Sequence, residues 1–473
     1  MKRVPDEGGV SVAEFCMQEY VYASLCVNFR SQGSPMSEGT SFAASPGRVI
    51  DIAADIRSGA RTPTDVVQAC LDRIAEVDGE VQAWVSVDSA GALAMAAEMN
   101  REANDGQFRG PLHGVPVAIK DICDVAGWPT RCNSRTRADA PPATADAEIV
   151  AALRAAGAIV LGKTHTTEFA YYDPSPARNP HNIGHTPGGS SSGSGAALGA
   201  GMVPAAIGTQ TVASVNRPAA YCGVSAFKPS TRSMGTYGIA PLAPFYDTPG
   251  VYGWSVADAC LLYEAIRPPH AREEHLDTSD VRVVVIDDPF LSEATEEIIA
   301  ARDRVAGQMR DAGHTMEEMA SPISLEDLNE LQGHTTVYEL ARVHAGLLEF
   351  PEDQVGAVLR QSVIDGNEIP DEVYQAERRQ IDAMRGAFLG GLRPTDILLW
   401  PATPATAPEG LEWTGDRRYI APWTAIGGPV ISLPAGLGTG DMPIGMLLVG
   451  VPGHDRHMAR VAPRLAEVVP QTS

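Results

Sequence analysis

The chain has 473 residues, and 36 lysine and arginine residues against 59 aspartate and glutamate residues give a formal net charge of −23. This length predicts two or three domains or one large α/β unit, and it suffices to bury a large core without disulfides. The acidic balance argues against a nucleic-acid binder, which needs a basic face. The seven cysteines are scattered without a Cys-x-x-Cys motif, so we expect reduced thiols, no zinc site and a cytoplasmic protein.

No segment of the sequence predicts a membrane span or a secretory signal. The uncharged stretch 183–216 is rich in glycine, serine and proline in its first half, and prolines interrupt the uncharged stretch 419–440. Neither stretch supplies about 20 continuous apolar residues. At the N-terminus, two basic residues are followed by acidic residues and glycines rather than by the apolar region of a secretory signal. Residues 1–43 mix isolated charges with serine and glycine, and we expect a partly disordered extension there.

From residue 48 onward, helical and extended patterns alternate along the chain. Apolar spacing predicts a helix over 48–59, a second helix from Thr62, and a third from Thr144 to Gly157. We expect 321–391 to be mainly helical. Short apolar runs predict extended or buried strand segments over 115–119, 158–161, 203–207, 281–286, 397–400 and 430–433. Strands that alternate with helices predict an α/β fold whose sheet is covered on both faces.

The most unusual stretch is Gly-Gly-Ser-Ser-Ser-Gly-Ser-Gly at 188–195. Glycines permit close backbone approach, serine hydroxyls are candidate nucleophiles, and the helix expected from Ala196 would favour negative charge at its N-terminus. A flexible linker, a phosphate-binding loop and the catalytic loop of a serine hydrolase are the three interpretations. Apolar elements follow the loop directly and no GxxxxGK[ST] motif is present, which favours the catalytic loop.

Further motifs stand in a fixed order around this loop. They are GVPVAIKD at 114–121, GAIVLGKT at 157–164, RNP at 178–180, TPGGSS at 186–191, SVNRPAAYCGV at 214–224 and KP at 228–229. Together they strongly resemble the amidase signature family, and their motif pattern is most similar to its malonamidase-like members. The resemblance implies one α/β/α domain around a large mixed sheet, the amidase domain 44–473. It also implies a homodimer, and no metal or organic cofactor.

The family uses a Ser-cisSer-Lys triad, and motif position assigns its members to Lys120, Ser190 and Ser214. The two serines lie 24 positions apart, the spacing expected in this family, which selects Ser190 from the run 190–192. The resemblance further implies a cis peptide bond between Gly189 and Ser190. Ser214 would attack the amide carbon and form an acyl-enzyme that water hydrolyses, with Ser190 as the proton relay.

Lys120 has a second interpretation when it is considered alone. It follows the alternating segment 115–119 and points away from that segment's apolar side chains. A lysine in such a place is ordinarily exposed or paired with a carboxylate, here Asp121. Catalysis by Lys120 requires a neutral amine, so burial and hydrogen bonding must lower its pKa from about 10.4. The neighbouring motifs favour the catalytic role.

The resemblance also assigns an oxyanion hole and substrate contacts. The oxyanion hole comprises the backbone N–H groups of Thr211, Val212, Ala213 and Ser214, whereas Gly189, Ser191 and Arg217 are the expected substrate-binding residues. The family usually has glycine at one or both positions before the nucleophile. Val212 and Ala213 restrict the backbone there, so a requirement for positive φ at Val212 would distort the hole.

Other site candidates keep two interpretations each. Arg217 either binds a substrate carboxylate through its guanidinium fork or holds a loop. Gln210 stands where many members have aspartate, although malonamidase-like members also carry Thr-Gln-Thr, and Asn216 stands where an apolar residue is common. Four aromatic residues either line a pocket or belong to the core or an interface: Tyr171, Tyr172, Phe245 and Tyr246. His181 and His185 have a metal-binding spacing, but prolines and a glycine argue against a helix there.

These observations predict an amidase that hydrolyses a carboxylic amide C–N bond through an acyl-serine intermediate, on a small, carboxylate-bearing substrate. Three alternatives stay open at this point. The chain could be a glutamine-hydrolysing subunit of an amidotransferase, which would deliver ammonia to a partner protein. It could transfer its acyl group to an amine in place of water. It could also be a degenerate, non-catalytic member, an alternative motivated by Val212 and Ala213.

Overall fold

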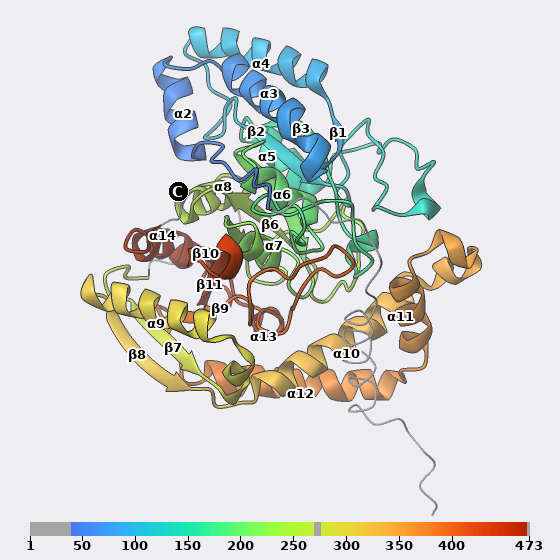
Figure 1. The fold of residues 1–473 in the computed structure, drawn as a ribbon, viewed down its shortest axis with the longest axis vertical. Coiled ribbons are helices and arrows are strands. Elements are labelled where there is room, and N and C mark those ends of the chain that lie inside the picture. Colours follow the sequence, from blue (N-terminus) through green and yellow to red (C-terminus); the bar gives the residue numbers. More distant parts are fainter. Residues whose placement is uncertain (1–38, 269–275, 471–473) are drawn as a thin grey trace, which may run out of the picture. The chain divides into compact units, whose positions relative to one another are not determined.

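The computed structural model describes residues 39–268 and 276–470, and these residues form an α/β fold around one mixed sheet (Figure 1). The sheet has eleven strands in the order β1-β3-β2-β4-β6-β5-β10-β11-β9-β7-β8. The strands are β1 (Trp84–Val87), β2 (Pro116–Lys120), β3 (Ile159–Thr164), β4 (Ala205–Gln210), β5 (Ser225–Lys228), β6 (Thr248–Gly253), β7 (Arg282–Asp287), β8 (Thr315–Ala320), β9 (Ile397–Pro401), β10 (Val430–Leu437) and β11 (Pro443–Gly450). The predicted α/β class with a large mixed sheet is therefore confirmed.

Helices connect most of these strands. They are α2 (Val49–Ser58), α3 (Pro63–Val81), α4 (Ser89–Asn104), α5 (Glu148–Ala155), α6 (Ser192–Gly199), α7 (Asn216–Tyr221), α8 (Val256–Ile266), α9 (Glu296–Asp311), α10 (Leu325–Val343), α11 (Ala357–Asn367), α12 (Asp371–Leu389), α13 (Ala421–Ile426) and α14 (Asp455–Ala466). The start of α3 shows why the sequence predicted it. The Thr62 hydroxyl accepts from the Asp65 N–H and the Asp65 carboxylate accepts from the Thr62 N–H, with Pro63 as the first helical residue.

Most predicted elements are present, and one boundary is wrong. The helix expected from Thr144 begins at Glu148, because Ala143 pairs with Ala126 in a β-bridge and 144–147 stays outside the helix. Gly157 follows the end of that helix with a φ of 91°, which favours glycine. The mainly helical prediction for 321–391 is confirmed by α10, α11 and α12.

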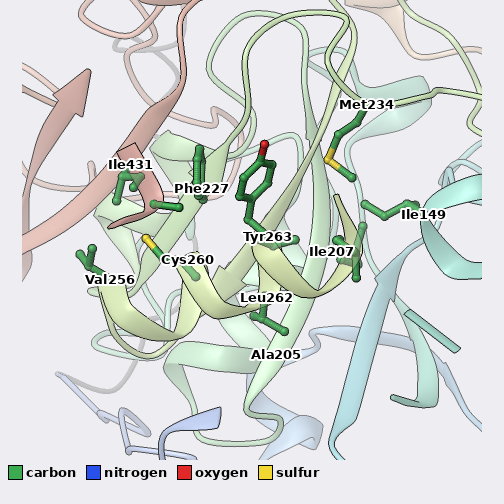
Figure 2. Packing of buried hydrophobic residues seen from close by; sticks show 14 of the residues in the cluster. Ile149, Ala205, Ile207, Phe227, Met234, Val256, Cys260, Leu262, Tyr263 and Ile431 are labelled. Atoms are coloured by element: carbon green, nitrogen blue, oxygen red, sulfur yellow. The ribbon is translucent and has the colours of Figure 1, made fainter. Parts of the chain in front are cut away.

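Alternate side chains of each strand point to opposite faces of the sheet, and apolar clusters cover both faces. In β2, Val117 and Ile119 belong to one buried cluster, while Ala118 belongs to a second. Figure 2 shows part of the first cluster, in which α8 packs on the sheet. There the rings of Tyr263 on α8 and Phe227 on β5 lie 4.5 Å apart. This two-sided burial explains the nearly continuous apolar character of the central strands.

The strands β2 and β4 are parallel neighbours, so the ends of both strands, with Lys120 and the turn before Ser214, lie on the same side of the sheet. Their register pairs Ile119 with Ile207, so Lys120 and the turn after Gln210 emerge side by side. The long helices α10 and α12 pack against each other, and α10 also packs on α13. Figure 1 shows these three helices together in orange and red. Helices α10 and α13 each supply one side-chain donor to the turn described below.

Residues 1–38 of the predicted extension lie outside the described residues. Of the remainder, Phe42 donates its N–H to the Pro180 carbonyl at 2.7 Å, and its own carbonyl accepts from Arg73. Among the described helices, none is long and apolar enough to cross a membrane.

Candidate active site

Lys120 ends β2 in a fully buried position beside two hydroxyl groups. Its Nζ lies 2.7 Å from Ser190 Oγ and 2.9 Å from Thr209 Oγ1. Burial of the amine lowers the pKa of Lys120 from 10.5 to about 7. The carboxylate considered as its partner, Asp121, instead pairs with Lys163 Nζ at 2.7 Å. The environment of Lys120 thus favours a neutral amine near neutral pH.

The glycine-serine loop is a packed structure that turns into α6, all of whose residues are buried. Packing explains Gly193, because a Cβ there would lie only 2.4 Å from the His165 amide nitrogen. The loop contains a cis peptide bond between Gly189 and Ser190. The burial of the whole segment excludes the flexible-linker interpretation of 188–195.

The three consecutive serines have different partners. Ser190 contacts Lys120, whereas the Ser191 hydroxyl donates to the Thr209 carbonyl at 3.3 Å. The Ser192 hydroxyl bonds to that of Ser175 at 2.6 Å. Sequence spacing and geometry therefore select the same member of the run as the neighbour of the lysine.

Ser214 lies in the turn between β4 and α7, next to the glycine-serine loop. The Ser191 N–H donates to the Ser214 carbonyl at 3.3 Å, and the Tyr252 hydroxyl donates to it at the same distance. Ser214 keeps 8% of its surface exposed, in contrast to the complete burial of Lys120. The nucleophile candidate thus adjoins the Ser190 loop and remains partly accessible.

The turn 211–214 presents unpaired N–H groups. Across the described ranges, no acceptor is recorded for the backbone N–H of Thr211, Val212, Ala213 or Ser214. The next two N–H groups, of Val215 and Asn216, both donate to Gln210 Oε1, at 2.9 and 3.0 Å. Four successive free donors beside a serine can bind the negative oxygen of a tetrahedral intermediate.

The replacement of glycine does not impose left-handed backbone on this turn. Neither Val212 nor Ala213 has a positive φ. Val212 packs against an apolar cluster that contains Ala213. The distortion considered for Val212 is thus not required by the backbone conformation present here.

Arg217 is buried in α7, and its guanidinium contacts backbone around the site. Its Nε and Nη2 donate to the Gly189 carbonyl at 3.2 and 2.8 Å, and its Nη1 donates to the Gly415 carbonyl at 2.5 Å. Nη2 also donates to Thr414 Oγ1 at 2.9 Å. Burial lowers the pKa of Arg217. These contacts tie the loop before Ser190 to the segment 414–415.

The other candidates are engaged elsewhere. The His181 and His185 rings contact separate backbone carbonyls, those of Cys222 and Ala407. Within residues 39–268 and 276–470, no group of three or more histidine, cysteine or acidic residues could hold a metal ion. The Tyr246 hydroxyl bonds to Thr335 on α10, and the Tyr171 hydroxyl donates to Ser362 on α11. Tyr171 packs edge-on against Tyr172, and the Phe245 ring lies 3.1 Å from the Arg378 guanidinium carbon.

Sequence reasoning missed several residues that contact Lys120 and the turn 211–214. Thr209 is the second partner of Lys120, and the Thr211 hydroxyl donates to the Asp247 carboxylate at 2.5 Å. Burial raises the pKa of Asp247. Gln332 and Thr424 donate to carbonyls of the turn. Thr209 and Thr211 flank Gln210 in the motif already noted, whereas the distant residues carry no local signal.

The family model for amidases matches residues 65–458, which includes both serines, Lys120 and the turn. The chain belongs to the amidase family. Its activity is accordingly the hydrolysis of amides, and the predicted amidase fold and enzyme class are confirmed.

Curated relatives extend over nearly the whole chain. A glutamyl-tRNA(Gln) amidotransferase subunit from Salinispora tropica is 32% identical, over 92% of this chain and 98% of that protein. AtzE, a 1-carboxybiuret hydrolase subunit from Pseudomonas sp. (strain ADP), is 30% identical, over 86% of this chain and 95% of that protein.

Solved amidase structures share the fold. A structure described as an amidase is 28% identical with a TM-score of 0.81, over 90% of this chain and all of that one. The peptide amidase of Stenotrophomonas maltophilia is 26% identical with a TM-score of 0.78, over 90% of this chain and 98% of that one.

Proposed function

We propose that this amidase cleaves its substrate through an acyl-enzyme on Ser214, with Ser190 and Lys120 as the proton relay. The observation that carries the proposal is the 2.7 Å contact between the buried Lys120 amine and Ser190 Oγ, next to the turn that holds Ser214. A serine hydroxyl is a weak nucleophile until a base removes its proton. With a pKa of about 7, the amine can accept that proton at neutral pH.

The proposed reaction has two halves. Ser214 Oγ attacks the amide carbon while its proton passes to Ser190 and the Ser190 proton passes to Lys120. The reverse transfer protonates the departing nitrogen, the C–N bond breaks, and the acyl group stays on Ser214. Water then attacks the ester through the same relay, releasing the acid. No metal or organic cofactor takes part in this scheme.

The free N–H groups of Thr211, Val212 and Ala213, with that of Ser214, are the proposed oxyanion hole. They face no recorded acceptor in the described part of the chain, so they are available to the oxygen that becomes negative. Removal of one such donor costs about 3–4 kcal/mol of transition-state stabilisation in the well-studied case. This arrangement speaks against the degenerate, non-catalytic alternative.

The substrate side of the proposal concerns Gly189, Ser191 and Arg217, with a small amide as substrate. In this proposal Gly189 and Ser191, which flank the relay serine, contact the substrate. For Arg217, the bonds to the Gly189 and Gly415 carbonyls favour a loop-holding role over direct binding of a substrate carboxylate. The Thr209-Gln210-Thr211 motif supports placement with malonamidase-like members.

A fluorophosphonate probe tests the mechanism without knowledge of the substrate. The purified protein is treated with the probe, and the adduct is mapped by peptide mass spectrometry in wild type, Ser214→Ala and Lys120→Ala. We expect one adduct, on Ser214, formed much more slowly without Lys120. An adduct on another serine, or labelling that ignores the loss of Lys120, would overturn the proposed roles.

The second candidate function is that of a glutamine-hydrolysing subunit. It is favoured by the 32% identity to a subunit of a glutamyl-tRNA(Gln) amidotransferase. Expression in the native organism followed by native mass spectrometry distinguishes it from the independent enzyme. Recovery as a homodimer from the cytoplasmic fraction is expected for the independent amidase, whereas a stable hetero-complex with glutaminase activity would favour the second candidate.

A further inference from the structure

The carbonyl groups of the turn 211–214 are all hydrogen-bonded, in contrast to its N–H groups. Each carbonyl in the turn accepts a hydrogen bond. The donors are Gln332 Nε2 to Thr211 (3.0 Å), Thr424 Oγ1 to Val212 (2.6 Å), the Arg217 N–H to Ala213 (2.9 Å), and both the Ser191 N–H and the Tyr252 hydroxyl to Ser214 (3.3 Å each). Two of these five donors are side chains from helices far away in sequence. The orientation of the turn therefore depends on α10 and α13.

Peptide planarity converts a held carbonyl into a directed N–H. In a trans peptide the C=O of one residue and the N–H of the next point in opposite directions. The bond from Thr424 to the Val212 carbonyl thereby sets the direction of the Ala213 N–H. In the same way, the bond from Gln332 to the Thr211 carbonyl sets the direction of the Val212 N–H. Both of these N–H groups belong to the proposed oxyanion hole.

Gln210 determines which way the Thr424 hydroxyl points. Gln210 Nε2 donates to Thr424 Oγ1 at 2.9 Å, while Gln210 Oε1 accepts from the N–H groups of Val215 and Asn216. A hydroxyl has one proton to donate. Because Thr424 accepts from Gln210, its proton is available for the Val212 carbonyl. An ionised carboxylate at position 210 would keep the two accepting contacts and remove this donor.

We propose that Thr424 and Gln210 are positioning residues that aim the Ala213 N–H at the oxygen of the reacting carbonyl. This inference rests on the proposed acyl-serine function and adds residues that touch neither substrate nor nucleophile. Thr424 is 1% exposed and Gln210 is fully buried, so the bond between these two side chains is shielded from competing water. A turn of Val212 and Ala213 obtains through side-chain donors the donor alignment that the reaction needs.

The test compares two replacements of Thr424 that separate the effect of its hydroxyl from the effect of its shape. Thr424→Val removes the hydroxyl and retains the branched shape, while Thr424→Ser retains the hydroxyl. We expect Thr424→Val to lower kcat about 10- to 100-fold with KM changed less than about threefold, because a misdirected donor is lost mainly in the transition state. We expect the Thr424→Ser variant to retain most of the wild-type activity. Circular-dichroism melting of each variant measures the accompanying change in stability.

Gln210→Glu provides the second arm, because it retains the acceptor for Val215 and Asn216. Its ionised carboxylate would accept the Thr424 proton and leave the Val212 carbonyl without its donor. We expect a loss in kcat similar to that of Thr424→Val, and a double variant no slower than the slower single variant. A peptide boronate, which forms a tetrahedral adduct on serine, should bind the variants at least tenfold more weakly than wild type.

The outcomes separate this inference from the proposed function. If Ser214→Ala is inactive while Thr424→Val and Gln210→Glu keep wild-type kcat, the positioning role is wrong and the acyl-serine proposal stands. If Thr424→Val and Thr424→Ser lose activity equally, the hydroxyl is not the cause and the inference is overturned. If Ser214→Ala retains full activity, the proposed function itself fails.

Discussion

Replacement of Lys120 by methionine should abolish activity and at the same time stabilise the folded protein. The buried amine has its pKa lowered from 10.5 to about 7. At pH 7 this lysine is therefore protonated in the unfolded chain but only partly protonated in the folded protein. At 1.36 kcal/mol per pKa unit, this difference disfavours folding by about 4 kcal/mol. Methionine removes this penalty and fills a similar volume.

The lost hydrogen bonds of the amine oppose this gain in the free energy of unfolding. Loss of the contacts to Ser190 and Thr209 costs about 1 kcal/mol each. The expected result is a free energy of unfolding about 2 kcal/mol higher than wild type at pH 7, measured by urea denaturation. The excess should shrink as pH rises from 7 toward 10.5, because folding releases the proton of Lys120 and this release costs less at higher pH, so wild type gains stability over that window.

Lys163→Met is the matched control for that experiment. Lys163 is as deeply buried as Lys120, but its Nζ pairs with Asp121. Its removal leaves a buried carboxylate without its cation, so we expect a loss of about 3–5 kcal/mol. If Lys120→Met is instead destabilised at pH 7 to a similar extent, Lys120 is a paired, protonated lysine, and the argument that it serves as a neutral base is refuted.

Three shorter predictions follow from the same geometry. The kcat/KM of the wild type should rise about tenfold per pH unit below the apparent pKa near 7 and level off above it, since the proposed mechanism requires neutral Lys120; a stopped assay over pH 5–9 that shows a fall through this range would contradict the role of Lys120 as the base. Ser214→Ala should lose turnover by at least about 10³-fold with its Tm within about 2 °C of wild type, and retained turnover would remove the nucleophile assignment. Arg217→Ala should lower kcat for acidic and neutral amides by similar factors, because its donors go to the Gly189 and Gly415 carbonyls; a KM increase confined to acidic amides would restore the substrate-carboxylate role.

The local sequence predicts those parts of the fold and of the candidate site that depend on short-range geometry. The capping motif at Thr62 and the alternation before Lys120 need only neighbouring residues, and both predicted elements are present. Short strands were harder to find. Strand β8 has an exposed, polar sequence at the edge of the sheet, and β6 contains proline and glycine, so neither shows the apolar run of a buried strand.

The supports of the turn could not be predicted in this way. Thr424 and Gln332 lie more than 100 positions from the carbonyls that they hold, and each stands in an ordinary helical context. A lone threonine on a helix carries no signal until the fold brings it to its acceptor. The helix start at Thr144 was wrong for a related reason, since the bridge from Ala143 to Ala126 is a tertiary pairing.

Three deeply buried lysines differ in their tertiary surroundings, and those surroundings select one of them as the candidate base. Lys163 forms an ion pair with the Asp121 carboxylate and has no serine hydroxyl as a partner among the described residues. Lys228 has its pKa lowered by burial to about 7, the same value as Lys120, but its Nζ donates to the carbonyls of Pro229 and Gly428. A carbonyl has no proton to give, so a neutral Lys228 has nothing to deprotonate among these partners. Lys120 combines the lowered pKa with hydroxyl partners, and that combination makes proton transfer feasible.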